Sequence, residues 1–240
     1  MYIDKTLCKN CLDCGPVCPV GAIQVADKSV VINLEDCVEC GVCLRYGICR
    51  EGAVKQVDEI PYPRIVRAIF SDPVQKHEST GIQGRGTEEM KTNDVTNLFT
   101  PGKIGFSIEL GRPGVGAYLS DLDRVTREVF TWDVELSREN PVFQLIEDHK
   151  TGALRSEVLG EKVLSAIVEL LIPEEKAIDF IFHMTSFLNQ AIDSVATISA
   201  ISRADDQGHA NLFALLEQNN IAFYPNGKVN IGLAAGREVL

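Results

Sequence analysis

The sequence predicts an α+β protein in which a small cysteine-rich module precedes a larger domain of strands and helices. All eight cysteines of the 240-residue chain lie between positions 8 and 49. From residue 103 onward, strand-like alternation and helix-like periodicity take turns. We therefore expect a cysteine-rich domain over 1–60, a linker strand with a long Gly/Thr-rich loop over 61–102, and an α+β domain over 103–240.

The cysteines form two groups with nearly the same spacing. The first group reads C-x2-C-x2-C-x3-C-P and the second reads C-x2-C-x2-C-x5-C. Three cysteines at intervals of three wrap a tight loop whose sulfurs converge on three corners of an iron–sulfur cubane, so the fourth ligand must come from elsewhere in the chain. The groups are Cys8, Cys11, Cys14 and Cys18, then Cys37, Cys40, Cys43 and Cys49.

An internal repeat supports this interpretation. The first three cysteines of each group correspond to one another, and the segment 20–23 recurs as the segment 51–54. Corresponding positions lie 29 residues apart at the first three cysteines and 31 residues apart from the last cysteine onward. The second half therefore contains a two-residue insertion, which falls within 44–48. Arg50 follows the last cysteine, where the first group has Pro19.

Residues 1–58 resemble a bacterial two-cluster 2[4Fe-4S] ferredoxin, on the cysteine spacing and the repeat. The resemblance implies a fold of short hairpin strands with two short helices, two [4Fe-4S] clusters, and transfer of single electrons at low potential. It also implies the ligands: Cys8, Cys11, Cys14 and Cys49 for one cluster, and Cys37, Cys40, Cys43 and Cys18 for the other.

Zinc and disulfides are the alternatives for these cysteines. Four-cysteine zinc sites use paired C-x2-C knuckles rather than three cysteines in a row, which disfavours zinc. Disulfides would not be confined to one short segment of a chain that has no secretory signal.

The charge of the chain bears on its partners. Lys and Arg number 23 against 34 Asp and Glu, which gives a net charge of −11. An acidic surface disfavours nucleic acid and anionic membranes and favours a basic patch on another protein. With no signal peptide and no apolar run long enough to span a membrane, we expect a cytoplasmic protein whose redox partner is a larger oxidoreductase subunit.

The linker is expected to begin with an extended segment at Pro61 and Pro63, followed by a strand over 64–70. Residues 71–102 are rich in Gly, Ser, Thr and Asn and lack apolar periodicity. Long loops of this kind are usually functional or disordered, and the sequence leaves both open.

Within that loop, residues 84–96 combine glycines with the hydrogen-bonding side chains of Arg85, Lys91 and Asn93. The stretch resembles one in 6-hydroxynicotinate reductase and similar iron–sulfur flavoproteins of anaerobes. The glycines and polar side chains could form a cradle for flavin or an anionic substrate, and the resemblance implies a reductase complex. A solvated loop without chemistry is the alternative.

The remaining chain is expected to form two βαβ-containing halves, an α+β sandwich similar to ferredoxin-like or small-molecule-sensing regulatory domains. Expected strands cover 103–110, 142–146, 163–172 and 194–202, expected helices cover 118–130, 174–191 and 211–218, and a hairpin is expected around 225–228.

A glycine-rich turn at 111–116 follows an expected strand and precedes an expected helix. Backbone N–H groups there, that of Gly114 among them, could hold an anion, although such turns often serve geometry alone. The four histidines are scattered, and the chain contains no hydrolase, protease or nucleotide-binding motif, so we expect no catalytic residue.

Three functions follow from these expectations. The first is an electron-transfer subunit of an oxidoreductase. The second is a reductase component that binds flavin or an anionic substrate at residues 81–116. The third is a ligand-sensing domain that gates electron flow.

Overall fold

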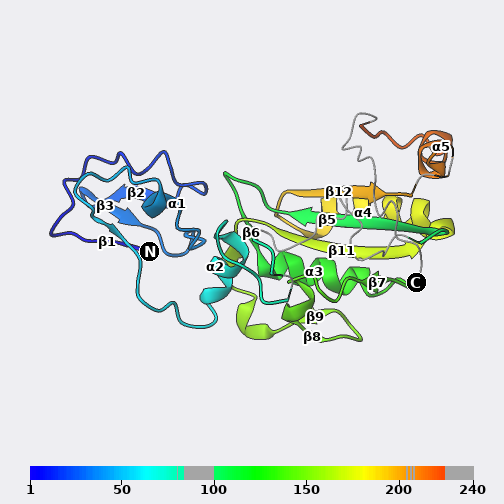
Figure 1. Ribbon diagram of the computed structural model, residues 1–240, viewed down its shortest axis with the longest axis horizontal. Helices are drawn as coiled ribbons and strands as arrows, with labels where there is room; N and C mark the ends of the chain where they lie inside the picture. The colour runs from blue at the N-terminus through cyan, green and yellow to red at the C-terminus, as the bar shows by residue number, and fades with distance from the viewer. Residues whose placement is uncertain (80, 84–99, 204, 206, 208, 225–240) are drawn as a thin grey trace.

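The cysteine-rich domain lies at one end of the molecule and a four-stranded sheet at the other, with helix α2 (Ile65–Ser71) between them (Figure 1). The computed structural model describes residues 1–79, 81–83, 100–203, 205, 207 and 209–224. Helices and strands are mixed along the chain, which confirms the α+β class.

Two small antiparallel ladders form the cysteine-rich domain, and the sequence repeat relates them. Ile3 pairs with Val54 in one ladder, and Ile32 pairs with Ile23 in the other. In the repeat, Ile32 is the counterpart of Ile3 and Val54 is the counterpart of Ile23, so the two ladders occupy equivalent places in the two halves. The strands are β1 (Tyr2–Ile3) paired with β4 (Val54–Lys55), and β2 (Ile23–Ala26) paired with β3 (Ser29–Ile32).

One short helix is present in this domain where the resemblance implied two. Helix α1 (Val42–Arg45) lies in the second half, while residues 13–17 of the first half form turns. The three residues between Cys14 and Cys18 include Pro16, which lacks a backbone N–H. The two-residue insertion gives the second half the length that a helical turn needs.

The strand expected over 64–70 is a helix, α2, and that expectation was wrong. The run of Ile, Val and Phe is short and apolar, and such runs do not distinguish strand from helix. Arg64 and Arg67 decide the matter physically. Residues three apart share one side of a helix but face opposite ways in a strand, and both arginines contact the same cysteine-rich loop.

The central sheet has the strand order β12-β5-β11-β7, and every neighbouring pair is antiparallel. β5 and β11 form its centre and pair along their whole lengths, from Ala166 opposite Leu110 to Pro173 opposite Lys103. The strands are β5 (Lys103–Leu110), β7 (Glu135–Leu136), β11 (Ala166–Pro173) and β12 (Ala196–Ile201).

One face of this sheet packs on helices α3 (Leu119–Val129) and α4 (Ala177–Ala191) and forms the main core. The rings of Phe106 on β5 and Phe180 on α4 meet with centroids 4.9 Å apart. Along β5 and β11, buried polar side chains alternate with the apolar ones and so point to the other face of the sheet. The Asn140 amide donates to the Glu169 carboxylate at 2.9 Å there.

The other elements mostly follow the expected pattern. The expected helices over 118–130, 174–191 and 211–218 are present, whereas 142–146, expected as a strand, is mainly a 3-10 turn. The expected hairpin at 225–228 lies outside the described residues. Among the described residues, no helix combines the length and apolar character needed to cross a membrane. The further elements are β6 (Ala117–Tyr118), η1 (Phe143–Leu145), β8 (Ile146–Asp148), β9 (Ala153–Leu154), η2 (Ser156–Val158), β10 (Lys162–Val163), η3 (Glu174–Lys176) and α5 (Asn211–Gln218).

We call the described residues from 103 onward the sheet domain. Replacing Phe106 by Ala should destabilise this domain by about 3–5 kcal/mol, because the change leaves a cavity beneath α4. Phe106 on β5 is 0% exposed, whereas Phe182 on α4 is 52% exposed. Phe182→Ala should therefore change stability by no more than about 0.5 kcal/mol. Denaturant unfolding followed by the fluorescence of Trp132, whose ring packs on Phe180, measures both; equal losses would contradict the assignment of this core.

Candidate metal centre

The eight cysteines gather into two sets, and each set mixes the two halves of the repeat. Burial raises the pKa of the Cys14 thiol, and repulsion from its neighbours Cys49, Cys11 and Cys8 raises it further. Because such repulsion fades with distance, these four thiols lie together. We call this group the outer set: Cys8, Cys11, Cys14 and Cys49.

The second group is assembled in the same way. Burial raises the pKa of Cys43 to about 12, and repulsion from Cys40, Cys37 and Cys18 adds to the effect. A small cavity is lined by all four of these cysteines together with Ile23 and Ile32. We call this group the inner set: Cys18, Cys37, Cys40 and Cys43.

Cys18 and Cys49 are the members that cross between the halves, and they occupy matching turns. The Ala22 amide donates to Cys18 Sγ at 3.2 Å, and the Ala53 amide donates to Cys49 Sγ at 3.2 Å. Gly21 and Gly52 precede these alanines and have φ angles of 67° and 60°, a left-handed conformation that favours glycine. Cys49 therefore sits as Cys18 does, despite the longer spacing before it and the absence of a following proline.

The two sets differ in their exposure to water. Three inner-set cysteines are buried and Cys18 is half-buried. In the outer set only Cys14 is buried, Cys8 and Cys49 are half-buried, and Cys11 is exposed. The inner set is thus the more enclosed of the two.

Two sets of four thiols with backbone amides aimed at their sulfurs suit two four-iron clusters, whose ligands are thiolates stabilised by N–H···S bonds. The raised thiol pKa values mean that these cysteines must lose protons when they bind metal. In the described part of the chain, no three His, Cys, Asp or Glu side chains converge as ligands of a single metal ion. In a cubane, by contrast, each cysteine binds a different iron.

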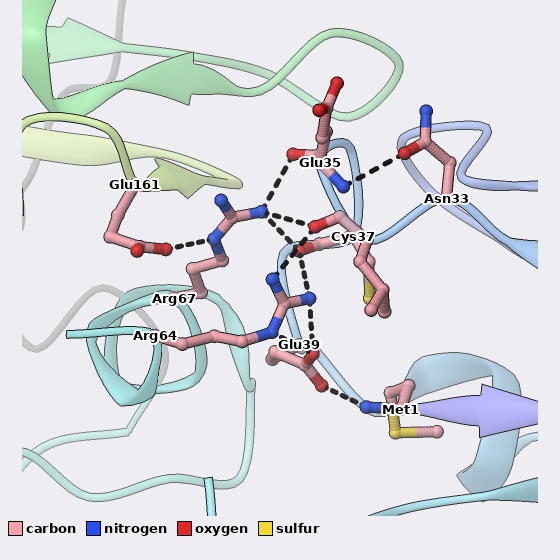
Figure 2. Close-up of polar contacts among 9 residues, drawn as sticks. Met1, Asn33, Glu35, Cys37, Glu39, Arg64, Arg67 and Glu161 are labelled. Atoms are coloured by element: carbon pink, nitrogen blue, oxygen red, sulfur yellow. Dashed lines mark hydrogen bonds and ion pairs between the residues drawn. The ribbon is translucent and has the colours of Figure 1, made fainter. Parts of the chain in front are cut away.

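Arg67 joins the inner set to the sheet domain. Its Nη1 lies 3.0, 2.8 and 2.9 Å from the carbonyl oxygens of Leu34, Glu35 and Cys37, and its Nε donates to Glu161 (Figure 2). Only 7% of the Arg67 side chain is exposed. A permanently charged guanidinium is therefore buried against the backbone of residues 34–37, the loop that carries Cys37.

A second charged group lies beside Arg67. The buried Glu39 carboxylate accepts from the Met1 ammonium at 2.6 Å and from Arg64 Nε at 2.8 Å (Figure 2). Arg64 also donates to the Leu34 carbonyl at 2.9 Å. Burial raises the pKa of the Cys37 thiol and the Glu39 charge raises it further, whereas the Met1 ammonium and Arg64 lower it, so these charges act on the inner set.

Further contacts tie the same region to the sheet domain. Lys162 forms an ion pair of 2.9 Å with Asp36, next to Cys37. The Gly114 amide, predicted above as a possible anion-binding group, donates to the carbonyl of Pro19, next to Cys18. A Cβ on Gly111 would lie 2.6 Å from the Leu164 carbonyl, so glycine at the start of this turn serves close packing.

The other predicted site residues, Arg85, Lys91 and Asn93, lie outside the described residues. Conversely, sequence reasoning missed Arg64 and Arg67. The two arginines are three residues apart, directly after the cysteine-rich domain. This spacing places them on one side of a helix, so it could have indicated a shared contact only if the segment had been predicted as helical.

Known proteins match the N-terminal part of the chain. The family model of the 4Fe-4S dicluster domain matches residues 1–49. An uncharacterized ferredoxin of Methanocaldococcus jannaschii is 43% identical over 56 residues, which are 22% of this chain and 87% of that protein. The chain belongs to the ferredoxin family. Its first residues form a ferredoxin domain with the 4Fe-4S binding and electron-transfer function of such domains.

Two further relatives match a similar share of the chain. Ferredoxin-1 of Rhodobacter capsulatus is 50% identical over 40 residues, 17% of this chain and 62% of that ferredoxin. The ferredoxin-type protein NapH of Haemophilus influenzae is 34% identical over 59 residues, 22% of this chain and 20% of NapH. The chain thus spans about 62% of the length of the Rhodobacter ferredoxin. No solved structure matches the chain significantly.

Paired cysteine substitutions test the crossed sets. Cys18→Ala with Cys40→Ala removes two members of the inner set and should leave one four-iron cluster, with about four iron atoms per chain. Cys18→Ala with Cys11→Ala removes one member from each set and should damage both clusters. Iron content and the electron paramagnetic resonance (EPR) spectrum of the reduced protein measure the outcome. If each cluster used cysteines of one half only, the two double variants would exchange results.

Proposed function

We propose that this chain transfers single electrons at low potential through two [4Fe-4S] clusters, as the electron-transfer subunit of a larger oxidoreductase. The observation that carries the proposal is the pair of four-thiol sets, each completed by a cysteine from the other half of the repeat. The outer set would hold one cluster and the inner set the other. When bound, each cluster would supply reversible one-electron chemistry between a donor and an acceptor protein.

The protein's own residues serve this function by enclosing and orienting the thiolates. The amides of Ala22 and Ala53 donate to Cys18 and Cys49, and such bonds stabilise thiolate charge. Apolar neighbours such as Ile23 and Val54 keep water from the sulfurs. Low dielectric and N–H···S bonds are the means by which a protein sets a cluster's potential.

Membership in a larger complex is supported by how the ferredoxin domain is held. The Arg67–Glu161 pair and the Lys162–Asp36 pair fasten it to the sheet domain, so it would present a fixed face to a partner protein. The acidic net charge of −11 suits docking against basic surfaces of a partner protein.

We also infer that the sheet domain contains two βαβ units of the ferredoxin-like type, an α+β arrangement unrelated to the iron–sulfur ferredoxin. β11 and β12 are both antiparallel to β5 and so run in one direction, with α4 between them in sequence. β5 and β7 are related in the same way through β11, with α3 between them. This arrangement is compatible with a docking or regulatory role. It names no ligand, because fold alone does not imply function.

Anaerobic purification from the native host, with iron, sulfide and flavin quantified, tests the proposal. We expect about eight iron and eight sulfide per chain and two one-electron reductions in a spectroelectrochemical titration. We also expect a larger oxidoreductase subunit to co-purify. Iron for only one cluster would contradict the two-cluster assignment. Recovery of the chain alone, as a free carrier, would contradict complex membership, and flavin in equal amount to the chain would favour a reductase component instead.

A further inference from the structure

The two cysteine sets differ in the charges that surround them. Beside the inner set, the Met1 ammonium, Arg64 and Arg67 provide three positive charges, and Glu39 and Glu161 provide two negative ones, a net charge of +1 that the neutral Arg45–Asp72 and Lys162–Asp36 pairs leave unchanged. Beside the outer set in sequence, Lys9 and Arg50 are balanced by Asp13 and Glu51, and all four are exposed to water. Water and salt screen exposed charges far more than buried ones.

The orientation of the Arg67–Glu161 ion pair increases this difference in charge between the two sets. Arg67 directs Nη1 to the carbonyl of Cys37 and Nε to Glu161, so the positive group lies between Cys37 and the carboxylate (Figure 2). Glu161 therefore stands on the far side of Arg67 from the inner set. Although the pair is neutral as a whole, its positive end faces Cys37.

Arg67 also fixes the peptide groups of the loop. It holds three carbonyl oxygens, those of Leu34, Glu35 and Cys37, toward itself. In a trans peptide the N–H points opposite to the C=O, so the amides that follow these carbonyls turn away from Arg67. Partial negative charge is thus held on the side of the loop that faces the sheet domain.

We propose that Arg67, assisted by Arg64, holds the reduction potential of the inner-set cluster above that of the outer-set cluster. Reduction adds one negative charge to a cluster, and a buried positive charge nearby favours the reduced state. Both arginines are positioning residues, since they act on the cluster through the loop and through their charge. The inference rests on the proposed function, because it requires that both sets bind clusters. A single added electron would reside on the inner set, next to α2 and the sheet domain.

Redox titration of the full-length, anaerobically reconstituted protein, followed by EPR, tests the proposal with two variants of opposite sign. Arg67→Gln removes the positive charge and should lower the higher midpoint by about tenfold in equilibrium constant, which is about 59 mV for one electron. Glu161→Gln removes the negative charge and should raise the same midpoint. The lower midpoint should move in neither variant. Arg67→Lys keeps the positive charge but loses the planar set of donors of the guanidinium, and it should retain most of the wild-type potential.

Two controls assign the shift to the inner set. In a Cys11→Ala background the outer-set cluster is disrupted, and the remaining midpoint should still respond to both substitutions. Arg50→Gln removes an exposed charge next to Cys49 and should leave both midpoints within about twofold in equilibrium constant.

The inference is overturned if Arg67→Gln shifts both midpoints equally or neither, or if Glu161→Gln shifts the higher midpoint downward. If Arg67→Gln fails to take up iron, the direction of the Glu161→Gln shift decides the question. Wild-type protein without two reducible clusters would overturn the proposed function itself and this inference with it. Two normal clusters that are insensitive to both substitutions would overturn only the inference.

Discussion

The arrangement of the two domains depends on one buried guanidinium. Placing Arg67 out of water costs several kcal/mol unless its donors are matched by acceptors. Three backbone carbonyls of the cysteine-rich loop and the carboxylate of Glu161 provide those acceptors. Because the acceptors come from both sides of α2, satisfying Arg67 requires the ferredoxin domain and the sheet domain to meet at this point.

The cysteine-rich domain was largely predictable because its information is local and repeated. Spacing alone indicates which thiols can surround a cubane, and the repeat indicates that Cys49 corresponds to Cys18. The structure adds the matching N–H···S bonds at both crossing cysteines, which the sequence could not reveal. The strand over 103–110 was equally accessible, since its eight residues alternate along a buried sheet and coincide with β5.

Prediction failed where distant partners decide the structure. Residues 64–70 read as a strand because β-branched and apolar side chains dominate them, but α2 is a helix that brings Arg64 and Arg67 to one side. The partner of Arg67 lies 94 residues further along the chain, beyond the reach of any local pattern. The glycine-rich turn misleads for the same reason, because the neighbours that require Gly111 and engage the Gly114 amide come from other elements.

The position of the sheet domain also determines from which side another protein can approach. A small ferredoxin standing alone could meet partners near either cluster. In this chain, contacts at Asp36, Cys37 and Pro19 already occupy the surface around the inner set. The exposed Cys11 and half-buried Cys8 and Cys49 leave the outer set as the side nearer to water. An approaching protein can therefore come closer to the outer set than to the inner set. The inner set, by contrast, is enclosed by residues of the same chain, among them Arg67, Lys162 and Gly114.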